Sequence, residues 1–214
     1  MSKYPDWATR TTEGEGSMGR GFVLGGLAAG VILIVFGVVS IVVGVDGRSE
    51  VRDRIAEEQI EGTDDMTPDA TRAAVKEAGL TDIDIPDCSV AGEQVDTGSE
   101  AKCFGSYMRV HALEGTGGQV YSQLPRAVDK ETGEPIPDDE AAAALEDGTA
   151  ISNPQRDTWV TETALSTALN TSYFAEKVSE FSIVTGIALL LVGIGLLVLT
   201  LGALRPQLGR RESV

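Results

Sequence analysis

The chain has 214 residues, a formal net charge of −16 and a mean hydropathy of +0.01. This average hides two uncharged apolar runs, residues 21–45 and 181–204, and a segment between them in which residues 46–177 hold 28 acidic and 11 basic side chains. Such an acidic surface excludes nucleic acid as a partner and disfavours adsorption to anionic lipid, because both attract basic patches.

Residues 1–20 mix glycine, serine, threonine and charges without periodicity, and we expect a disordered tail there. The uncharged run at 21–45 follows, and a helix needs roughly 20 apolar residues to cross a bilayer. A cleaved signal peptide is the alternative, but its apolar core spans about 7 to 15 residues and ends at a small-residue cleavage site. The sequence therefore predicts an uncleaved transmembrane helix at 21–45.

Beyond this run, Val51, Ile55 and Gln59 stand four apart among charged residues. That spacing is typical of one face of a helix. We predict that the helix continues over 46–61 and stops at Gly62.

A short helix is predicted over 68–78. Thr67 has the side chain of an N-cap, and Pro68 suits the first helical position. Gly79 is the residue expected just past the end.

Cys88 and Cys103 are the two cysteines of the chain. If their segment lies in an oxidising compartment, a disulfide is favoured, and it would stabilise the fold by roughly 3 kcal/mol. Two buried free thiols are the alternative. Aromatic and apolar residues at helical spacing after Cys103 predict a further helix over 103–114.

Residues 117–153 are rich in proline, glycine and acidic residues, and we expect loops with one or two helical turns at 139–146. Asn153 and Pro154 then form an N-cap and first-turn pair. We predict a single helix from about 154 to about 201, comprising an outer part at 154–180 and a transmembrane helix at 181–204. Residues 205–214 form the last tail.

Small residues line one predicted face of this long helix, both in the outer part and in the span. They are Thr161, Ala164, Ala168, Thr171, Ala175, Ser182, Gly186, Gly193 and Thr200. The first span carries a matching face of Gly26, Gly30, Gly37, Ser40 and Gly44. Small residues let membrane helices approach closely, so we predict an antiparallel pair.

In this pair Gly44 would lie level with about Ser182. Val51 and Ile55 would lie level with Ala175 and Thr171. Two alternatives remain: glycine and alanine are common in apolar helices, and a second set of glycines could form the face of a homo-oligomer. That second set is Gly21, Gly25, Gly195 and Gly202.

Basic residues near the spans set the orientation of membrane proteins. Arg10, Arg20, Arg205, Arg210 and Arg211 favour cytoplasmic termini. Arg48, Arg52 and Arg54 count against this orientation. We expect both termini in the cytoplasm and residues 46–180 outside it.

His111 is the one histidine of the chain, so an iron site of two histidines and one carboxylate cannot form within it. We expect no catalytic residue, no metal site and no cofactor. A membrane-anchored sensor or ligand-binding module is the alternative function, and Tyr107, His111 and Tyr121 are its candidate pocket residues.

The blocks DMTPDA, CFGSYMRVHALEGTGG and NPQRDTWVTETALSTALNTSYFAEKVSEFSIVTGIALLL resemble a family of small bacterial two-pass membrane proteins of unknown function. Members of that family are often labelled aromatic ring-opening dioxygenases. This sequence departs from the label by having one histidine and two predicted spans, and the resemblance implies no catalytic residues.

These observations predict a mainly α-helical membrane protein. Its fold would be an antiparallel two-helix transmembrane hairpin with long helical extensions and a small, loop-rich, mostly helical extracytoplasmic domain held by a disulfide. We expect a non-enzymatic protein of the cell membrane whose partners are the bilayer and another membrane or envelope protein or a second copy.

Overall fold

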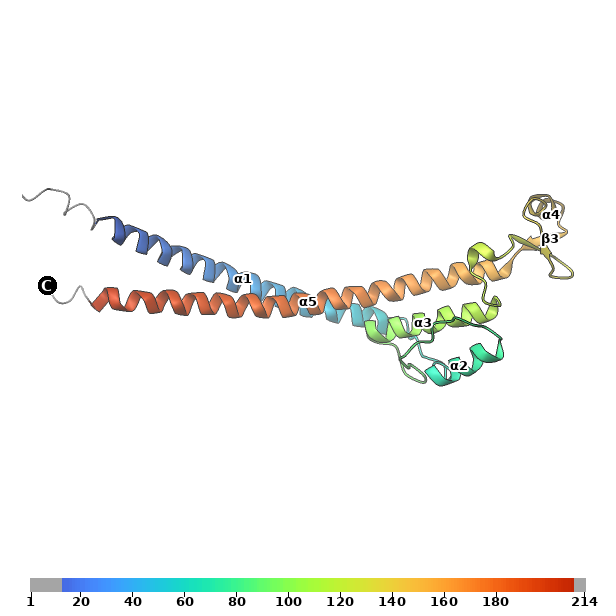
Figure 1. The fold of residues 1–214 in the computed structure, drawn as a ribbon, viewed down its shortest axis with the longest axis horizontal. Helices are drawn as coiled ribbons and strands as arrows, with labels where there is room; N and C mark the ends of the chain where they lie inside the picture. The colour runs from blue at the N-terminus through green and yellow to red at the C-terminus, as the bar shows by residue number, and fades with distance from the viewer. Residues whose placement is uncertain (1–12, 210–214) are drawn as a thin grey trace, which may run out of the picture. The chain divides into compact units, whose positions relative to one another are not determined.

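The structure is a computed structural model that describes the backbone of residues 13–209 and the side chains of residues 21–202. Of the predicted tails at 1–20 and 205–214, residues 1–12 and 210–214 lie outside the described backbone. The chain is mainly helical (Figure 1) and divides into two compact units, Met1–Asp46 with Val178–Val214, and Gly47–Lys177.

Two helices, α1 (Glu13–Glu57) and α5 (Pro154–Gly209), each contain a segment long and apolar enough to cross a membrane. Among the described residues, only 17% and 11% of their most apolar windows are buried. The core helix of a soluble protein would be mostly buried, and these windows are mostly exposed.

Helix α1 begins at Glu13, so the predicted disorder is wrong for residues 13–20. Starting a helix is costly, whereas extending one gains a hydrogen bond for each residue fixed. The helix formed by the apolar run can therefore continue into the residues before it.

At its other end α1 stops at Glu57, four residues before the predicted end. Gln59 has a left-handed φ of 51°, and this turn breaks the helical course of the chain. The Ile60 carbonyl then accepts a hydrogen bond from the Val95 N–H at 2.8 Å, so the backbone there is paired outside a helix.

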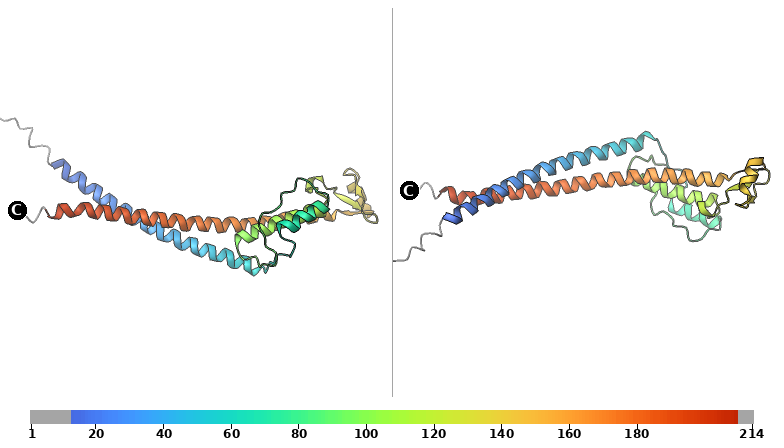
Figure 2. Two further views of the ribbon diagram at one scale, coloured as in Figure 1. Left: turned by 60° about the horizontal axis from the view of Figure 1, so that its bottom comes forward. Right: turned by 90° about the horizontal axis from the view of Figure 1, so that it is seen from above.

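Helix α2 (Pro68–Glu77) has the predicted N-cap, because the Thr67 hydroxyl accepts from the Ala70 N–H. Gly79 follows with a left-handed φ of 69°. In Figures 1 and 2 this helix lies against α3.

Helix α3 (Gly98–Gly115) begins five residues before the predicted start. Thr97 and Glu100 form a capping box: the Thr97 side chain accepts from the Glu100 N–H, and the Glu100 side chain accepts from the Thr97 N–H. This reciprocal pair satisfies backbone donors that are unpaired at a helix start. The sequence TGSE before Cys103 is the signal for it.

The region predicted as loops contains a small antiparallel sheet. Its order is β2 (Pro135–Ile136), β1 (Ala127–Asp129) and β3 (Ala150–Ser152), with Ala127 opposite both Ile136 and Ser152. A 3-10 turn, η1 (Tyr121–Gln123), precedes the sheet, and α4 (Ala141–Asp147) packs on it. Strands of two or three residues are too short to show an alternating pattern in a sequence.

Helix α5 continues without a break from Pro154 to Gly209. Asn153 accepts from the Gln155 N–H at 3.0 Å, as expected for the residue that caps this helix. Within the second unit, α3 runs antiparallel to α5: Gly98 lies beside Glu176, and Gly115 lies beside Gln155.

The second unit has two apolar clusters around α3. The first cluster comprises Ile55, Val95, Ala101 and Leu169, and Val51 packs against it. The second comprises Met66, Val90, Cys103 and Tyr107. The first cluster joins α1, α3 and α5, and the second joins α3 to the loops on either side of α2.

Candidate functional site

The most buried charge in the second unit is Glu176 on α5, which is 1% exposed. One carboxylate oxygen accepts hydrogen bonds from Arg52 at 2.7 Å and Arg48 at 3.2 Å, both on α1. The other oxygen accepts the Gly98 N–H at 2.7 Å, from the first turn of α3. A single carboxylate thus connects three helices, and we call these four residues the Glu176 cluster.

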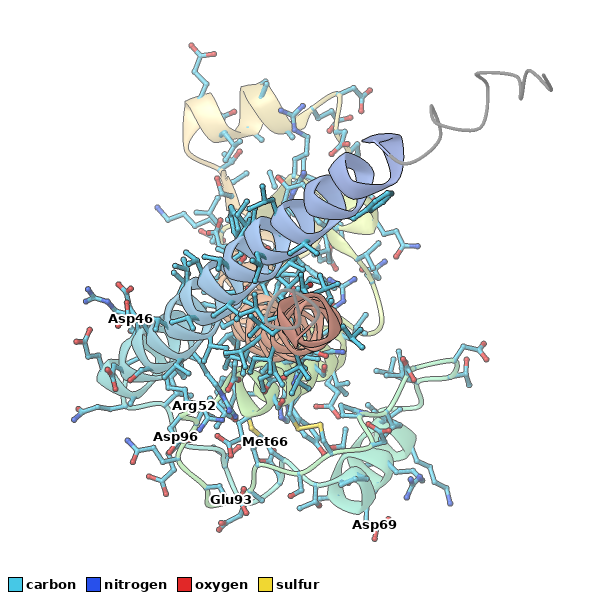
Figure 3. All side chains as sticks on the ribbon, turned by 90° about the vertical axis from the view of Figure 1, so that its left-hand side faces the viewer. Asp46, Arg52, Met66, Asp69, Glu93 and Asp96 are labelled. Atoms are coloured by element: carbon cyan, nitrogen blue, oxygen red, sulfur yellow. A yellow bond between two sulfur atoms is a disulfide. The ribbon has the colours of Figure 1, made fainter. Side chains whose placement is uncertain are left out.

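Burial alone opposes ionisation of Glu176, but hydrogen bonds from Arg52, from the Gly98 N–H and from Arg48 outweigh it and lower the pKa of this carboxyl. The same contact raises the pKa of Arg52. Arg52 also lies near Asp96 (Figure 3), whose charge adds to the effect. The arrangement favours a permanent ion pair, which suits a structural role better than proton transfer.

A second buried carboxylate lies further along α5. Glu162 is 4% exposed and accepts from Ser166 at 2.9 Å and from Arg109 on α3 at 3.4 Å. The Arg109 guanidinium also stacks 4.2 Å from the centre of the Trp159 ring. Trp159 is 2% exposed and donates to the Gln119 carbonyl, so this corner joins α3, α5 and the loop between them.

The face of α5 buried in the second unit differs from the predicted one. Glu162, Leu169 and Glu176 are buried and stand seven residues apart, whereas Ala168 is exposed and Ala175 only half-buried. Ala168 is therefore not part of the side that α5 buries within the second unit. A seven-residue repeat drifts by about 20° per heptad from an ideal helix of 3.6 residues per turn, and the predicted face used the ideal value.

The remaining predicted packing residues lie where α1 meets α5 in the first unit. They are the buried glycines Gly30, Gly37, Gly44, Gly186 and Gly193. A Cβ atom at Gly37 would lie 2.8 Å from the Gly186 carbonyl oxygen, and one at Gly193 would lie 2.8 Å from the Gly30 carbonyl oxygen. Backbones this close exclude any side chain at these positions.

The predicted levels of Gly44 and Ile55 agree with the contacts to within one helical turn. Gly44 lies against Ser179 and Ile183, which stand on either side of Ser182 in the chain. Ile55 clusters with Leu169, two residues from the predicted Thr171, which is itself exposed. The second set of glycines has open space instead: a Cβ at any member would meet nothing within 4 Å. Its members are Gly21, Gly25, Gly195 and Gly202.

Cys88 and Cys103 form a disulfide, as the sequence predicts. Tyr107 is fully buried next to it and donates its hydroxyl hydrogen to the Cys88 carbonyl oxygen. Burial, and then the charge of Asp87, raise the pKa of Tyr107. The bond and the tyrosine together attach the loop at residues 81–97 to α3.

The three residues of the candidate ligand pocket have separate surroundings. Tyr107 is 0% exposed, so it cannot line a pocket that is open to solvent. His111 lies between Glu114, 3.1 Å from Nδ1, and Asp65, 3.5 Å from Nε2. Tyr121 lies under the Arg156 guanidinium. Each of the three side chains thus has its own polar partner, and a ligand pocket shared by all three stays a prediction.

Within the described part of the chain, no group of three or more His, Cys, Asp or Glu side chains could hold a metal ion. The two carboxylates beside His111 are those of Asp65 and Glu114. His111 also borders a depression between α3 and α5 whose lining includes Met108 and Asp157.

Sequence reasoning missed both buried carboxylates and their arginines. The available signal was the seven-residue spacing of Glu162, Leu169 and Glu176, which places two acids in line with a leucine. Comparison with family models, with curated proteins and with solved structures found no match to this chain.

Proposed function

We propose that the chain is a non-enzymatic two-pass protein of the cell membrane that presents an acidic extracytoplasmic domain for protein interaction. One observation carries the membrane part of this proposal. Large apolar side chains around both apolar runs stay exposed, for example Phe22 at 79%, Phe181 at 70% and Leu199 at 72%. Soluble monomers rarely expose contiguous apolar patches larger than a few hundred Å², whereas lipid would cover these side chains.

The glycine contacts support an antiparallel transmembrane hairpin. Gly30, Gly37 and Gly44 follow one another along α1, and their neighbours on α5 follow in reverse order, Gly193, Gly186 and Ser179. A signal peptide that is cleaved from the protein would not need such contacts with α5. Loss of α1 would also remove Ile55 from the core of the second unit and Arg52 from Glu176.

The disulfide and the arginines near the chain ends support placing residues 46–180 outside the cytoplasm. Disulfides persist in oxidising compartments, and basic residues favour the cytoplasmic side. The resemblance to a two-pass bacterial family implies two membrane spans.

The proposed interaction role rests on which carboxylates are buried in ion pairs and which acidic groups remain at the surface. Both deeply buried carboxylates, Glu162 and Glu176, are held by arginines in structural contacts. The acidic groups left at the surface can attract or repel a partner over a distance of about 10 Å at 0.1 M salt.

The test is extraction and labelling of the full chain in membranes. The protein should remain in the pellet in alkaline carbonate, and a membrane-impermeant maleimide should label Glu131→Cys in intact cells. Epitope tags at either end should be protected from external protease. Release of the protein by carbonate would reject the membrane assignment, and external access to the tags would reverse the orientation.

A further inference from the structure

One side of α5 in the second unit exposes no charge. Between Thr158 and Ala175 the only charged residue is Glu162, and it is 4% exposed. Residues 46–177 as a whole carry 28 acidic and 11 basic side chains. A stretch of about 27 Å of helix at 1.5 Å per residue thus presents a neutral surface within a strongly acidic domain.

The exposed residues on this side form two rows with a seven-residue repeat. Val160, Thr167 and Phe174 form one row, and Ala164 and Thr171 form the other. Val160 is 56% exposed and Phe174 is 67% exposed. We call these five residues the outer face. It lies opposite the buried residues Glu162, Leu169 and Glu176, so it is free of the contacts that α5 makes with α1 and α3.

Along the sequence both rows continue into the second apolar run without a charge. The first row continues with Phe181, Ala188, Gly195 and Gly202, and the second with Val178, Thr185, Val192 and Leu199. Gly195 and Gly202 have open space where a side chain would begin. Two uncharged rows that repeat every seven residues have the spacing of the contact positions in a left-handed coiled coil, whose partner is another helix.

We propose that the outer face binds α5 of a second copy of this chain in a parallel coiled coil. This inference rests on the proposed membrane function, because copies in one membrane share an orientation and bring the same residues of α5 together in register. Charge also favours this face. Two acidic domains repel each other, and an uncharged helix side lets them touch without placing like charges in contact.

The size of the surface fits such a pair. The outer face and the row in the apolar run present roughly 27 Å and 37 Å of helix, at 1.5 Å per residue and about 10 Å in width. They offer roughly 600 Å² per copy, or roughly 1,200 Å² for the pair, which is the lower limit of about 1,200 Å² for a stable specific interface.

Thiol cross-linking of the full chain in its native membrane tests the proposal. Thr167→Cys and Phe174→Cys place a thiol on the outer face, and Leu165→Cys is the control. Leu165 is 47% exposed but lies about 140° around the helix from the outer face. The native cysteines are joined in a disulfide and will not react. Two differently tagged copies are expressed together and treated with a short bismaleimide.

We expect a covalent dimer that carries both tags at Thr167→Cys and Phe174→Cys, and at least fivefold less of it at Leu165→Cys. Adding Phe174→Glu to Thr167→Cys should reduce the dimer at least fivefold, whereas adding Leu165→Glu should leave it unchanged. Equal cross-linking at all three positions, or no product carrying both tags, would overturn the proposal. So would a product with a different protein.

Carbonate extraction of the same samples separates this inference from the proposed function. A chain that stays in the membrane without cross-linking at the outer face overturns only the dimer. A chain that leaves the membrane overturns the proposed function, and with it the parallel register.

Discussion

Arg52 Nε lies 2.7 Å from Glu176 Oε1, although the two residues are 124 positions apart in the chain. Through this contact the last turns of α1 are attached to α5 at the point where α3 begins. Gly98 contributes its backbone N–H to the same carboxylate. The packing of the second unit therefore requires residues from both ends of the segment between the apolar runs.

Replacing Glu176 by glutamine should destabilise the second unit by about 2 kcal/mol, because a neutral amide oxygen accepts weaker hydrogen bonds than a carboxylate does. Water compensates part of the loss, since the Arg48 and Arg52 side chains are 40% and 41% exposed. Guanidinium unfolding of the full chain in micelles measures this change. The signal is the fluorescence of Trp159, and the other tryptophan, Trp7, is replaced by phenylalanine so that it does not contribute. The control is Glu57→Gln, whose ion pair with Arg54 is exposed. It should change the stability by less than about 0.5 kcal/mol.

Acidification should remove the contribution of Glu176. Its pKa is lowered in the folded chain from an ordinary value of 4.5, so the stabilisation is fully present above pH 4.5 and is lost as the pH falls through the folded pKa. The wild-type unit should lose more stability than Glu176→Gln between pH 6 and pH 3 on the same unfolding curves. Parallel curves for the two proteins would contradict the lowered pKa.

Gly37→Leu should disrupt the contact between α1 and α5, because its Cβ would lie 2.8 Å from both the Gly186 carbonyl oxygen and the Leu190 nitrogen. Overpacking of this kind costs about 1–3 kcal/mol. Gly25→Leu on the same helix has open space and is the matched control. Resistance to unfolding by sodium dodecyl sulfate should fall for Gly37→Leu alone, and equal resistance of both variants would argue against the close approach.

Replacing both cysteines by serine should lower the stability of the second unit by about 3 kcal/mol in the chain-entropy estimate for a loop of this length. Dithiothreitol should have a similar effect on the wild type and none on the double variant. In a separate variant, Tyr107→Phe removes the hydrogen bond to the Cys88 carbonyl and should lower the unfolding free energy of the second unit by about 1 kcal/mol. Insensitivity of the wild type to the reductant would count against a structural disulfide.

Ala168→Leu should change the unfolding free energy by less than about 0.5 kcal/mol, because Ala168 is exposed. Ala101→Leu is the comparison: Ala101 is 0% exposed in the first apolar cluster, and a larger side chain there should cost about 1–3 kcal/mol. A large loss in Ala168→Leu would restore the packing face predicted from the ideal helix.

Much of the local structure could be predicted because its signals are local. Thr67 and Pro68 mark the start of α2, Asn153 precedes α5, and two long uncharged runs identify the apolar helices. The cysteine pairing also followed, since only one pairing was available. The capping box of α3 is also a local signal, but the apolar residues at helical spacing begin only at Phe104, and they predicted a start five residues too late.

By itself the sequence determined the approximate positions of the long helices, the caps of α2 and α5, the apolar runs and the disulfide, because each depends on residues a few positions apart or on a unique pair. Only the tertiary structure decided which side of α5 is buried, since a drift of about 20° per heptad accumulates along a long helix. It also decided that Glu176 meets Arg52 and that Ala168 faces outward. Such contacts depend on where three helices lie in space, which a pattern along one helix does not contain.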